Sequence, residues 1–283
     1  MSVKGQSIVI TGATDGIGKV AALELAKMGA NVVLVGRNVA KGEAVVRELK
    51  TAAGHDGVHF VAGDMSSQKC VRAAAEAIKG RLKRLDVLLN NAGAYFQTRQ
   101  LSEDGIERTL ALNHLGYFLL TAQLLDLLKA SGPSRIVNVA SAAHQGAKLD
   151  LDDLQNEKRY SGFGVYGQSK LANVYFTYEL ARRLRGTSVT ANCLHPGFVA
   201  TRFGDNNGGF VKTLIGLAKS LAAISEADGA KTSVCLASSP EVAGVSGKYF
   251  DKCKAVKSST VSYDEDVARE LWRLSERMTG IVA

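Results

Sequence analysis

The sequence predicts a single-domain α/β protein with a doubly wound parallel sheet of about seven strands and helices on both faces. Two observations predict this fold class. Short apolar runs rich in β-branched residues alternate with amphipathic stretches along the chain, and glycine-rich turns follow several of the apolar runs. Strands that alternate with helices require right-handed crossovers, and therefore a parallel sheet covered on both faces.

The elements can be placed in order by periodicity. The first strand, residues 7–10, is a β-branched run, and the first helix, residues 19–28, carries Val20, Leu23 and Ala26 at helical spacing. The same two patterns then alternate. The other predicted strands are residues 31–36, 58–62, 85–89, 135–140, 189–194 and 248–250. The other predicted helices are residues 39–53, 67–81 (with alanines on the packed side), 105–130, 163–185, 211–223, 225–237 and 264–278.

The composition fits one domain spanning residues 1–283. Apolar residues make up 46% and charged residues 22% of the chain, which allows a sizeable core. Only three prolines occur, and no Ser/Pro/Gly-rich linker divides the sequence. The net charge of +8 comes from dispersed basic residues with no aromatic-interleaved stripe. We therefore expect no nucleic-acid partner, and a basic surface that favours an anionic cofactor.

Cysteines and hydropathy indicate the compartment. The four cysteines lie far apart, and Cys193 and Cys235 have apolar neighbours typical of packed thiols. No metal-ligand spacing surrounds them, and His114 and His195 are expected to make structural hydrogen bonds. The strand at residues 7–10 leaves no room for a signal peptide, and no apolar run approaches the ~18 residues of a membrane span. We expect a cytoplasmic protein without a metal or a transmembrane segment.

The turn from Thr11 to Gly18 joins the first strand to the first helix. Such a turn aims free backbone N–H groups and the positive end of a helix dipole at one point, which suits a phosphate. Glycines there allow the turn and the approach of a pyrophosphate. The alternative is an ordinary glycine-rich turn, because three spaced glycines are a weak signal. The turn residues expected to bind a dinucleotide are Gly12, Thr14, Asp15, Gly16, Ile17 and Gly18.

The end of the second strand indicates which dinucleotide is bound. An acidic residue at this place accepts hydrogen bonds from the ribose of NAD, but no carboxylate occurs between residues 31 and 42. Arg37 stands there instead, and its guanidinium can hold a 2′-phosphate, which favours NADP (NADPH). Asn38 and Lys41 are expected beside it. Asp64 is a turn residue by default, and the alternative is that its carboxylate accepts from the adenine amino group. Met65 stands next to it and is also expected to bind the cofactor.

Two further motifs complete a family resemblance. Asn90-Asn91-Ala92-Gly93 closes the fourth predicted strand, and Tyr166-Gly167-Gln168-Ser169-Lys170 lies near the start of helix 163–185. With the glycine turn, Asn113, Ser141 and Pro196-Gly197 in the expected order, the chain resembles the short-chain dehydrogenase/reductase family over essentially its whole length. The Gly-x-x-x-Gly-x-Gly spacing is that family's own. The resemblance implies a Rossmann-type fold and an NAD(P)(H)-dependent enzyme.

The resemblance narrows to the retinol-dehydrogenase-like branch, which includes WW-domain-containing oxidoreductases. The run from His144 to Asn173, Asn113-His114-Leu115-Gly116 and Leu194-His195-Pro196-Gly197 are similar to that branch. It implies NADP(H) and a lipophilic carbonyl or alcohol, such as a retinoid, a steroid or a xenobiotic-like aldehyde or ketone. Many animal members carry an N-terminal membrane anchor that this sequence does not show, which argues against membrane-dissolved retinol as the substrate.

The resemblance implies four catalytic residues. Tyr166 exchanges a proton with the substrate oxygen. Lys170, together with the positive charge of oxidised nicotinamide, lowers the pKa of that phenol, and it also holds the ribose. Ser141 stabilises the oxygen, and Asn113 binds a relay water. The structural alternatives are an amphipathic tyrosine, a surface lysine, a strand-end turn serine and a packing asparagine. The further cofactor-binding residues that it implies are Asn91, Ala92, Gly93, Tyr166, Lys170, Pro196, Gly197, Val199 and Thr201.

The substrate pocket is defined less sharply. Residues 203–224 combine a glycine-rich segment with an apolar stripe, and we expect a substrate lid there, with core packing or peripheral membrane contact as alternative uses. Resemblance also implies a homo-oligomer. Competing functions are an NADP(H) sensor with little turnover and a C=C reductase. The expected substrate contacts are Tyr95, His144, Gln145, Phe163, Phe198 and Phe203.

Overall fold

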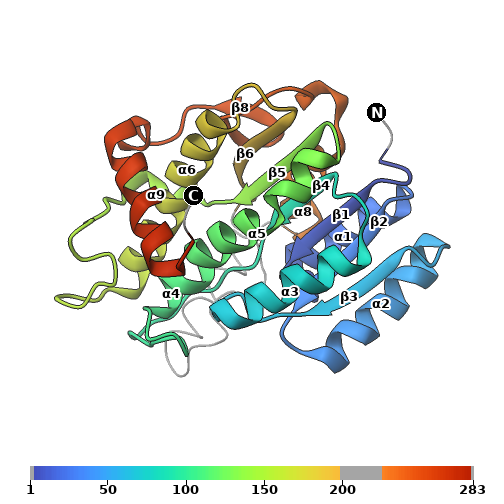
Figure 1. Ribbon diagram of the computed structural model, residues 1–283, viewed down its shortest axis with the longest axis horizontal. Coiled ribbons are helices and arrows are strands. Elements are labelled where there is room, and N and C mark those ends of the chain that lie inside the picture. Colours follow the sequence, from blue (N-terminus) through green and yellow to red (C-terminus); the bar gives the residue numbers. More distant parts are fainter. Residues whose placement is uncertain (1–2, 198–224, 282–283) are drawn as a thin grey trace.

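One sheet forms the middle layer of the protein (Figure 1). The computed structural model describes residues 3–197 and 225–281, and within them eight strands pair in the order β3-β2-β1-β4-β5-β6-β7-β8. All pairings are parallel except that of β7 with β8. The strands are β1 (Ser7–Thr11), β2 (Asn31–Gly36), β3 (Val58–Ala62), β4 (Val87–Asn90), β5 (Ser134–Val139), β6 (Val189–His195), β7 (Tyr249–Asp251) and β8 (Lys254–Val256).

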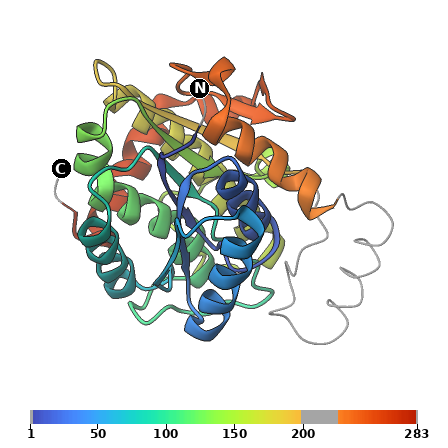
Figure 2. The same cartoon turned by 90° about the vertical axis from the view of Figure 1, so that its right-hand side faces the viewer.

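Helices cover both faces of the sheet, as Figure 2 shows. On one face α1 (Gly16–Lys27) packs against α2 (Val39–Ala53) and α8 (Glu226–Ser238). On the other, α3 (Gln68–Arg81) packs against α5 (Gly116–Ala130), and α6 (Gly162–Arg183) packs against α9 (Glu265–Thr279). Shorter elements are α4 (Arg108–Leu110), the π-helical turn η1 (Ala111–Leu115), and the 3₁₀ turns η2 (Ala142–Gly146), η3 (Pro240–Val242) and η4 (Thr260–Tyr263).

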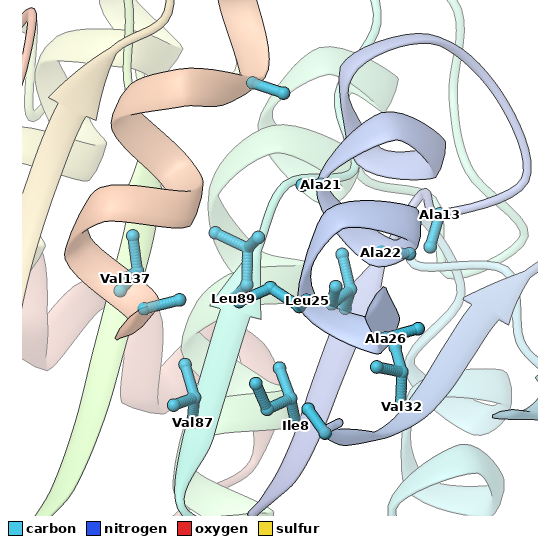
Figure 3. Close-up of a cluster of buried hydrophobic side chains, with 14 of the residues drawn as sticks. Ile8, Ala13, Ala21, Ala22, Leu25, Ala26, Val32, Val87, Leu89 and Val137 are labelled. Atoms are coloured by element: carbon cyan, nitrogen blue, oxygen red, sulfur yellow. The ribbon is translucent and has the colours of Figure 1, made fainter. Parts of the chain in front are cut away.

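The core is split by the sheet into two apolar clusters. Ile8, Val87 and Leu89 point toward α1 and α8, and Figure 3 shows them meeting Leu25 of α1. The intervening residues, such as Val9, point to the opposite face and meet α3, α5 and α6. Strands buried on both faces need continuous apolar sequence, which is why β1 and β2 are runs of Ile, Val and Leu.

The predicted α/β fold is confirmed, with one strand more than expected. The extra strand is β8, whose three residues are all exposed and show no apolar alternation. It forms a hairpin on β7 through Lys252 and Cys253, both at positive φ (48° and 61°). The predicted helix at residues 105–130 begins later, at Arg108, and contains the π-helical turn η1. The predicted helix at residues 211–223 lies outside the described residues.

The strand order indicates which edge of the sheet can bind a ligand. The chain runs outward from β1 to β3 and then returns to place β4 on the other side of β1. The crevice between the carboxyl ends of β1 and β4 is therefore the topological switch point, where doubly wound sheets bind ligands. The turn after β1, the Asn91–Gly93 segment after β4 and Ser141 after β5 all lie at this edge.

Candidate active site

The glycine turn after β1 is braced from β4. The Thr11 hydroxyl accepts hydrogen bonds from the backbone N–H groups of Asn91 (2.9 Å) and Ala92 (3.0 Å). The Asn91 amide in turn donates to the Thr11 carbonyl (2.9 Å). Gly12 has φ +65°, and a Cβ on it would lie 2.8 Å from the Cα of Ala92. The turn therefore needs glycine for both its conformation and its contact with the neighbouring strand.

The start of α1 presents its N-terminus to this turn. Asp15 is the N-cap, and its carboxylate accepts from the Gly16 N–H (3.1 Å). A Cβ at Gly18 would stand 2.5 Å from both the Gly12 carbonyl oxygen and Asn91 Nδ2. Thr14 is partly buried against Gly36, and Ile17 packs against the core. The predicted turn residues are thus brought together between the end of β1 and the start of α1.

Gly18→Ala tests this close packing. The added methyl must push the Gly12 carbonyl and Asn91 apart, so we expect a loss of about 1–3 kcal/mol of unfolding free energy and weaker NADPH binding. Gly80→Ala is the matched control, because it is also helical but a Cβ there meets nothing within 4 Å. It should be neutral or slightly stabilising. Urea denaturation and NADPH titration of both variants check this, and equal behaviour would contradict the packing argument.

Two basic residues follow β2, since Arg37 comes directly after the strand and Lys41 lies in the first turn of α2. Arg37 is exposed, and its Nη1 lies 3.9 Å from Asp64 Oδ2. Lys41 Nζ lies 2.5 Å from Asp15 Oδ2. Asn38 caps α2 by accepting from the Lys41 N–H, and Asp64 accepts from Ser66. Arg37 and Lys41 thus lie near the Thr11–Gly18 turn, and their assignment to a dinucleotide stays a prediction. Met65 is buried in the core, so only its backbone can face a ligand.

Lys170 lies one helical turn after Tyr166 on α6 and is buried beside it. Its side chain is 3% exposed, and Nζ donates to the Val139 carbonyl (3.0 Å) at the end of β5. Nζ lies 5.7 Å from the ring centroid of Tyr166 and 5.8 Å from that of Tyr117. A Cβ at Gly93 would come within 3.3 Å of Nζ. The ammonium is therefore enclosed by aromatic rings and backbone.

Burial controls the protonation of this pair. Loss of water lowers the pKa of Lys170 to about 7. Burial also raises the pKa of Tyr166 to about 12, against a hydrogen bond with the Ser141 side chain that lowers it. The sequence-based expectation of a lowered phenol pKa includes the positive charge of oxidised nicotinamide and stays a prediction. Without that charge, loss of water around the pair disfavours both the phenolate of Tyr166 and the ammonium of Lys170.

Ser141 and Asn113 complete the group of predicted catalytic residues. The Ser141 hydroxyl accepts from the Ala143 N–H (3.2 Å) at the start of η2. Asn113 lies in the π-helical turn η1, a type of element frequent at functional sites. Its amide bonds both the N–H and the carbonyl of Ala94 (2.9 and 3.0 Å) and the Ser169 hydroxyl (3.0 Å). Asn113 thus ties the end of β4 to α6 directly behind Lys170.

The expected substrate contacts separate into three groups. The Tyr95 ring lies edge-on to Tyr166, with centroids 6.5 Å apart, and Phe163 and Gln145 are exposed. His144 is fully buried with both ring nitrogens in hydrogen bonds, so its assignment to the substrate pocket is corrected. Two of the expected cofactor-binding residues, Pro196 and Gly197, follow β6 at the site edge. Outside the described residues lie the expected substrate contacts Phe198 and Phe203, the expected cofactor contacts Val199 and Thr201, and the lid expected at residues 203–224.

Sequence reasoning missed several residues that support the site. Thr11 braces the glycine turn, and Asn173 donates to the Asn113 carbonyl (2.9 Å). Tyr117 follows Asn113 by one helical turn, and its buried hydroxyl has no hydrogen-bond partner within residues 3–197 and 225–281. The helical spacing of Asn113 and Tyr117 was a usable signal for a shared face. The structural hydrogen bonds expected for His114 and His195 are confirmed, to Ser275 and to the Ala142 N–H.

The described residues show neither a metal-binding cluster nor a membrane-spanning helix. They contain no group of three or more His, Cys, Asp or Glu side chains placed to hold a metal ion. None of the helices they form is both long and apolar enough to cross a membrane.

Comparison with known proteins agrees with this geometry. A sequence model of the family described as short chain dehydrogenase matches residues 6–209. Retinol dehydrogenase 14 of Homo sapiens is 43% identical, over 98% of this chain and 87% of its own length. Among solved structures, an uncharacterised protein from Mycobacterium Paratuberculosis is 33% identical with a TM-score of 0.80, covering 99% of this chain and 95% of its own. The Pseudomonas aeruginosa RhlG/NADP active-site complex is 26% identical with a TM-score of 0.71, covering 88% and 95%.

Proposed function

Since this chain belongs to the short-chain dehydrogenase family, we propose that it is an NADP(H)-dependent oxidoreductase that interconverts a carbonyl and an alcohol on a lipophilic substrate. The observation that carries the proposal is the enclosed Lys170 ammonium beside Tyr166, with Ser141 bonded to that phenol. The similarity to a retinol dehydrogenase supports a retinoid, steroid or comparable lipophilic substrate. The NADP complex of a structural relative supports the choice of cofactor.

The residues present fit a dinucleotide. Gly12 and Gly18 keep the turn so close that side chains there would collide with neighbours, and the α1 N-terminus can receive a pyrophosphate. Arg37 and Lys41 would hold a 2′-phosphate, Asp64 the adenine, and Lys170 the ribose hydroxyls. Asn91, Ala92, Gly93, Pro196 and Gly197 line the same edge. When bound, the cofactor supplies the hydride.

Tyr166 handles the proton in this proposal. With a pKa raised to about 12, the phenol is protonated at neutral pH and can donate to a carbonyl oxygen. Ser141, already bonded to that phenol, would hold the same oxygen and stabilise the charge that develops on it. Lys170 in its charged form favours the phenolate that remains after transfer. In the alcohol-oxidising direction Tyr166 must first lose its proton.

Arg37→Asp tests the 2′-phosphate assignment. The variant replaces a charged donor by a repelling carboxylate, so we expect about 100-fold weaker NADPH binding and little change for NADH. Arg47→Asp is the matched control, because it makes the same charge change at an exposed position about two turns after the start of α2. Isothermal titration with both cofactors measures the effect. Equal weakening of NADPH and NADH would contradict the assignment.

Turnover is tested directly by NADPH oxidation against a panel of aldehydes, ketones and retinoids. The expected result is consumption of NADPH with at least one lipophilic carbonyl. If NADPH binds tightly but no carbonyl supports turnover, the reductase proposal fails and the sensor alternative gains. The cytoplasmic location and the homo-oligomer stay predictions, to be checked by cell fractionation and by light scattering.

A further inference from the structure

The peptide unit between Ser141 and Ala142 is held from both sides by histidine rings. Its carbonyl, on Ser141, accepts a hydrogen bond from His144 Nδ1 (2.6 Å). Its N–H, on Ala142, donates to His195 Nδ1 (3.1 Å). His144 belongs to η2 and His195 ends β6, so the two rings come from separate elements. A single peptide plane, directly after the predicted catalytic serine, thus has both of its polar groups bound by imidazoles.

The hydrogen bonds define the protonation state of each ring. His144 Nε2 is 3.0 Å from the backbone N–H of Ser259, which can only donate, so Nε2 carries a lone pair and the proton sits on Nδ1. His195 Nδ1 faces the Ala142 N–H and must carry a lone pair, so the proton of that ring sits on Nε2. The two rings are therefore neutral and of opposite tautomer. Protonating either ring sets two N–H groups against each other.

Each ring is anchored by a distant part of the chain. His144 packs its ring 4.8 Å from Tyr249 of β7, and its partner Ser259 follows Ser258, whose hydroxyl bonds Tyr178 and Ser262. His195 is paired in register with Asp251 of β7 and directly precedes Pro196-Gly197. The peptide after Ser141 is thus tied to the C-terminal segment on one side and to the predicted cofactor-binding end of β6 on the other.

We propose that His144 and His195 are positioning residues that hold the Ser141–Ala142 peptide, and so the Ser141 hydroxyl, in the orientation needed at the substrate oxygen. The inference rests on the proposed function, since it gives Ser141 its role there. Neither ring contacts the reacting atoms. Both act through the backbone on either side of one peptide bond. A misplacement of about 1 Å at such a group can cost about 100-fold in rate.

The surroundings keep both rings neutral at neutral pH. Burial lowers the pKa of His144, against the hydrogen bond to Ser141 that raises it. Burial likewise lowers the pKa of His195, against the charge of Asp251, while His144 adds to the lowering. The titratable groups that face the pair are Asp251 and Tyr249 of β7, and the two rings themselves. Because the pKa of each ring is lowered, the arrangement is intact at pH 7 and is lost only on acidification.

Asparagine and glutamine variants separate the two ring nitrogens. An asparagine amide reaches the place of Nδ1, and a glutamine amide reaches that of Nε2. His195→Asn keeps an acceptor for the Ala142 N–H and should retain kcat within about threefold, whereas His195→Gln should lose about 30-fold. His144→Asn keeps the donor to Ser141 but leaves the Ser259 N–H unpaired, so it should lower Tm and retain kcat. His144→Gln should do the reverse, keeping Tm and losing kcat. In the Gln variants the Kd of NADPH should not change.

The pH dependence is measured as the ratio of kcat of the wild type to kcat of His195→Asn. The ratio is needed because Lys170, with a pKa of about 7, titrates in both proteins. The kcat of the wild type relative to His195→Asn should fall by threefold or more on acidification, since only the wild type loses the bond to Ala142 when its ring is protonated. Gln variants with full kcat, or Asn variants that lose kcat in step with Tm, would overturn the proposal.

A second readout needs no turnover. The protein has five histidines, and long-range ¹H–¹⁵N spectra, assigned with the same variants, report the tautomer of each ring. At pH 7 His144 should be the Nδ1–H form and His195 the Nε2–H form. Another tautomer or a charged ring at either position would refute the proposed hold of the two rings on the Ser141–Ala142 peptide. If the tautomers are as expected but the protein reduces no carbonyl, the proposed function is refuted, and with it the role of the two rings in turnover.

Discussion

Replacing Tyr166 by phenylalanine is expected to lower kcat for carbonyl reduction by about 1000-fold, with NADPH binding almost unchanged. The phenol is the proton donor in the proposed reaction, and its raised pKa of about 12 keeps it protonated throughout the neutral range. The variant keeps the aromatic ring over Lys170 and the edge-on contact with Tyr95. Steady-state kinetics with NADPH and the best carbonyl of the panel measure the effect.

Tyr175→Phe is the matched control for this experiment. Tyr175 lies further along the same helix, and its hydroxyl donates to the Val261 carbonyl (2.6 Å), outside the site. Its loss should cost about 1 kcal/mol of stability and leave kcat within about twofold. A Tyr166→Phe enzyme with more than a tenth of wild-type kcat would show that another group supplies the proton.

Lys170→Met is expected to stabilise the fold while lowering kcat by about 100-fold. Burial lowers the pKa of Lys170 from 10.5 to about 7. The unfolded chain therefore binds one more proton than the folded one between these values, and acidification through that window destabilises the wild type by up to about 1.4 kcal/mol per pH unit. Below pH 7 the penalty stays constant, because both states are then protonated. Methionine fills similar space without a charge.

Urea denaturation at pH 9.5 and pH 7.5 measures this effect. The stability advantage of Lys170→Met over the wild type should widen by about 2 kcal/mol from the higher to the lower pH. In Lys170→Met the Val139 carbonyl loses its hydrogen bond from Lys170 but keeps the one from the Asn173 amide (3.5 Å), which limits the loss of stability. Lys129→Met, at an exposed position of α5, is the control and should show no such widening. A constant advantage at both pH values would mean that Lys170 is not desolvated.

Local pattern was sufficient for much of the fold. The bounds of β2, α2 and β3 agree with the predicted ranges, because each is a run whose periodicity and turn residues lie within the run itself. β8 escaped prediction because it exists only by pairing with β7, and its exposed residues carry no apolar alternation. The π-helical turn holding Asn113 was missed for a similar reason, since its sequence is as apolar as an ordinary helix.

The site likewise combines features that local sequence predicts with features that depend on the tertiary structure. The sequence by itself determined that Tyr166 and Lys170 share a helix face, that a glycine turn precedes α1, and that Arg37 replaces an acid at the end of β2, because spacing and residue type decide these features. Only the tertiary structure decided the direction of the pKa shifts of Tyr166 and Lys170 and the hydrogen-bond partners of the His144 ring. Both depend on burial and on backbone partners far away in the chain, such as the Ser259 N–H that gives the His144 ring its tautomer. Desolvation and long-range hydrogen bonds produce no periodic pattern in the sequence, so periodicity cannot predict them.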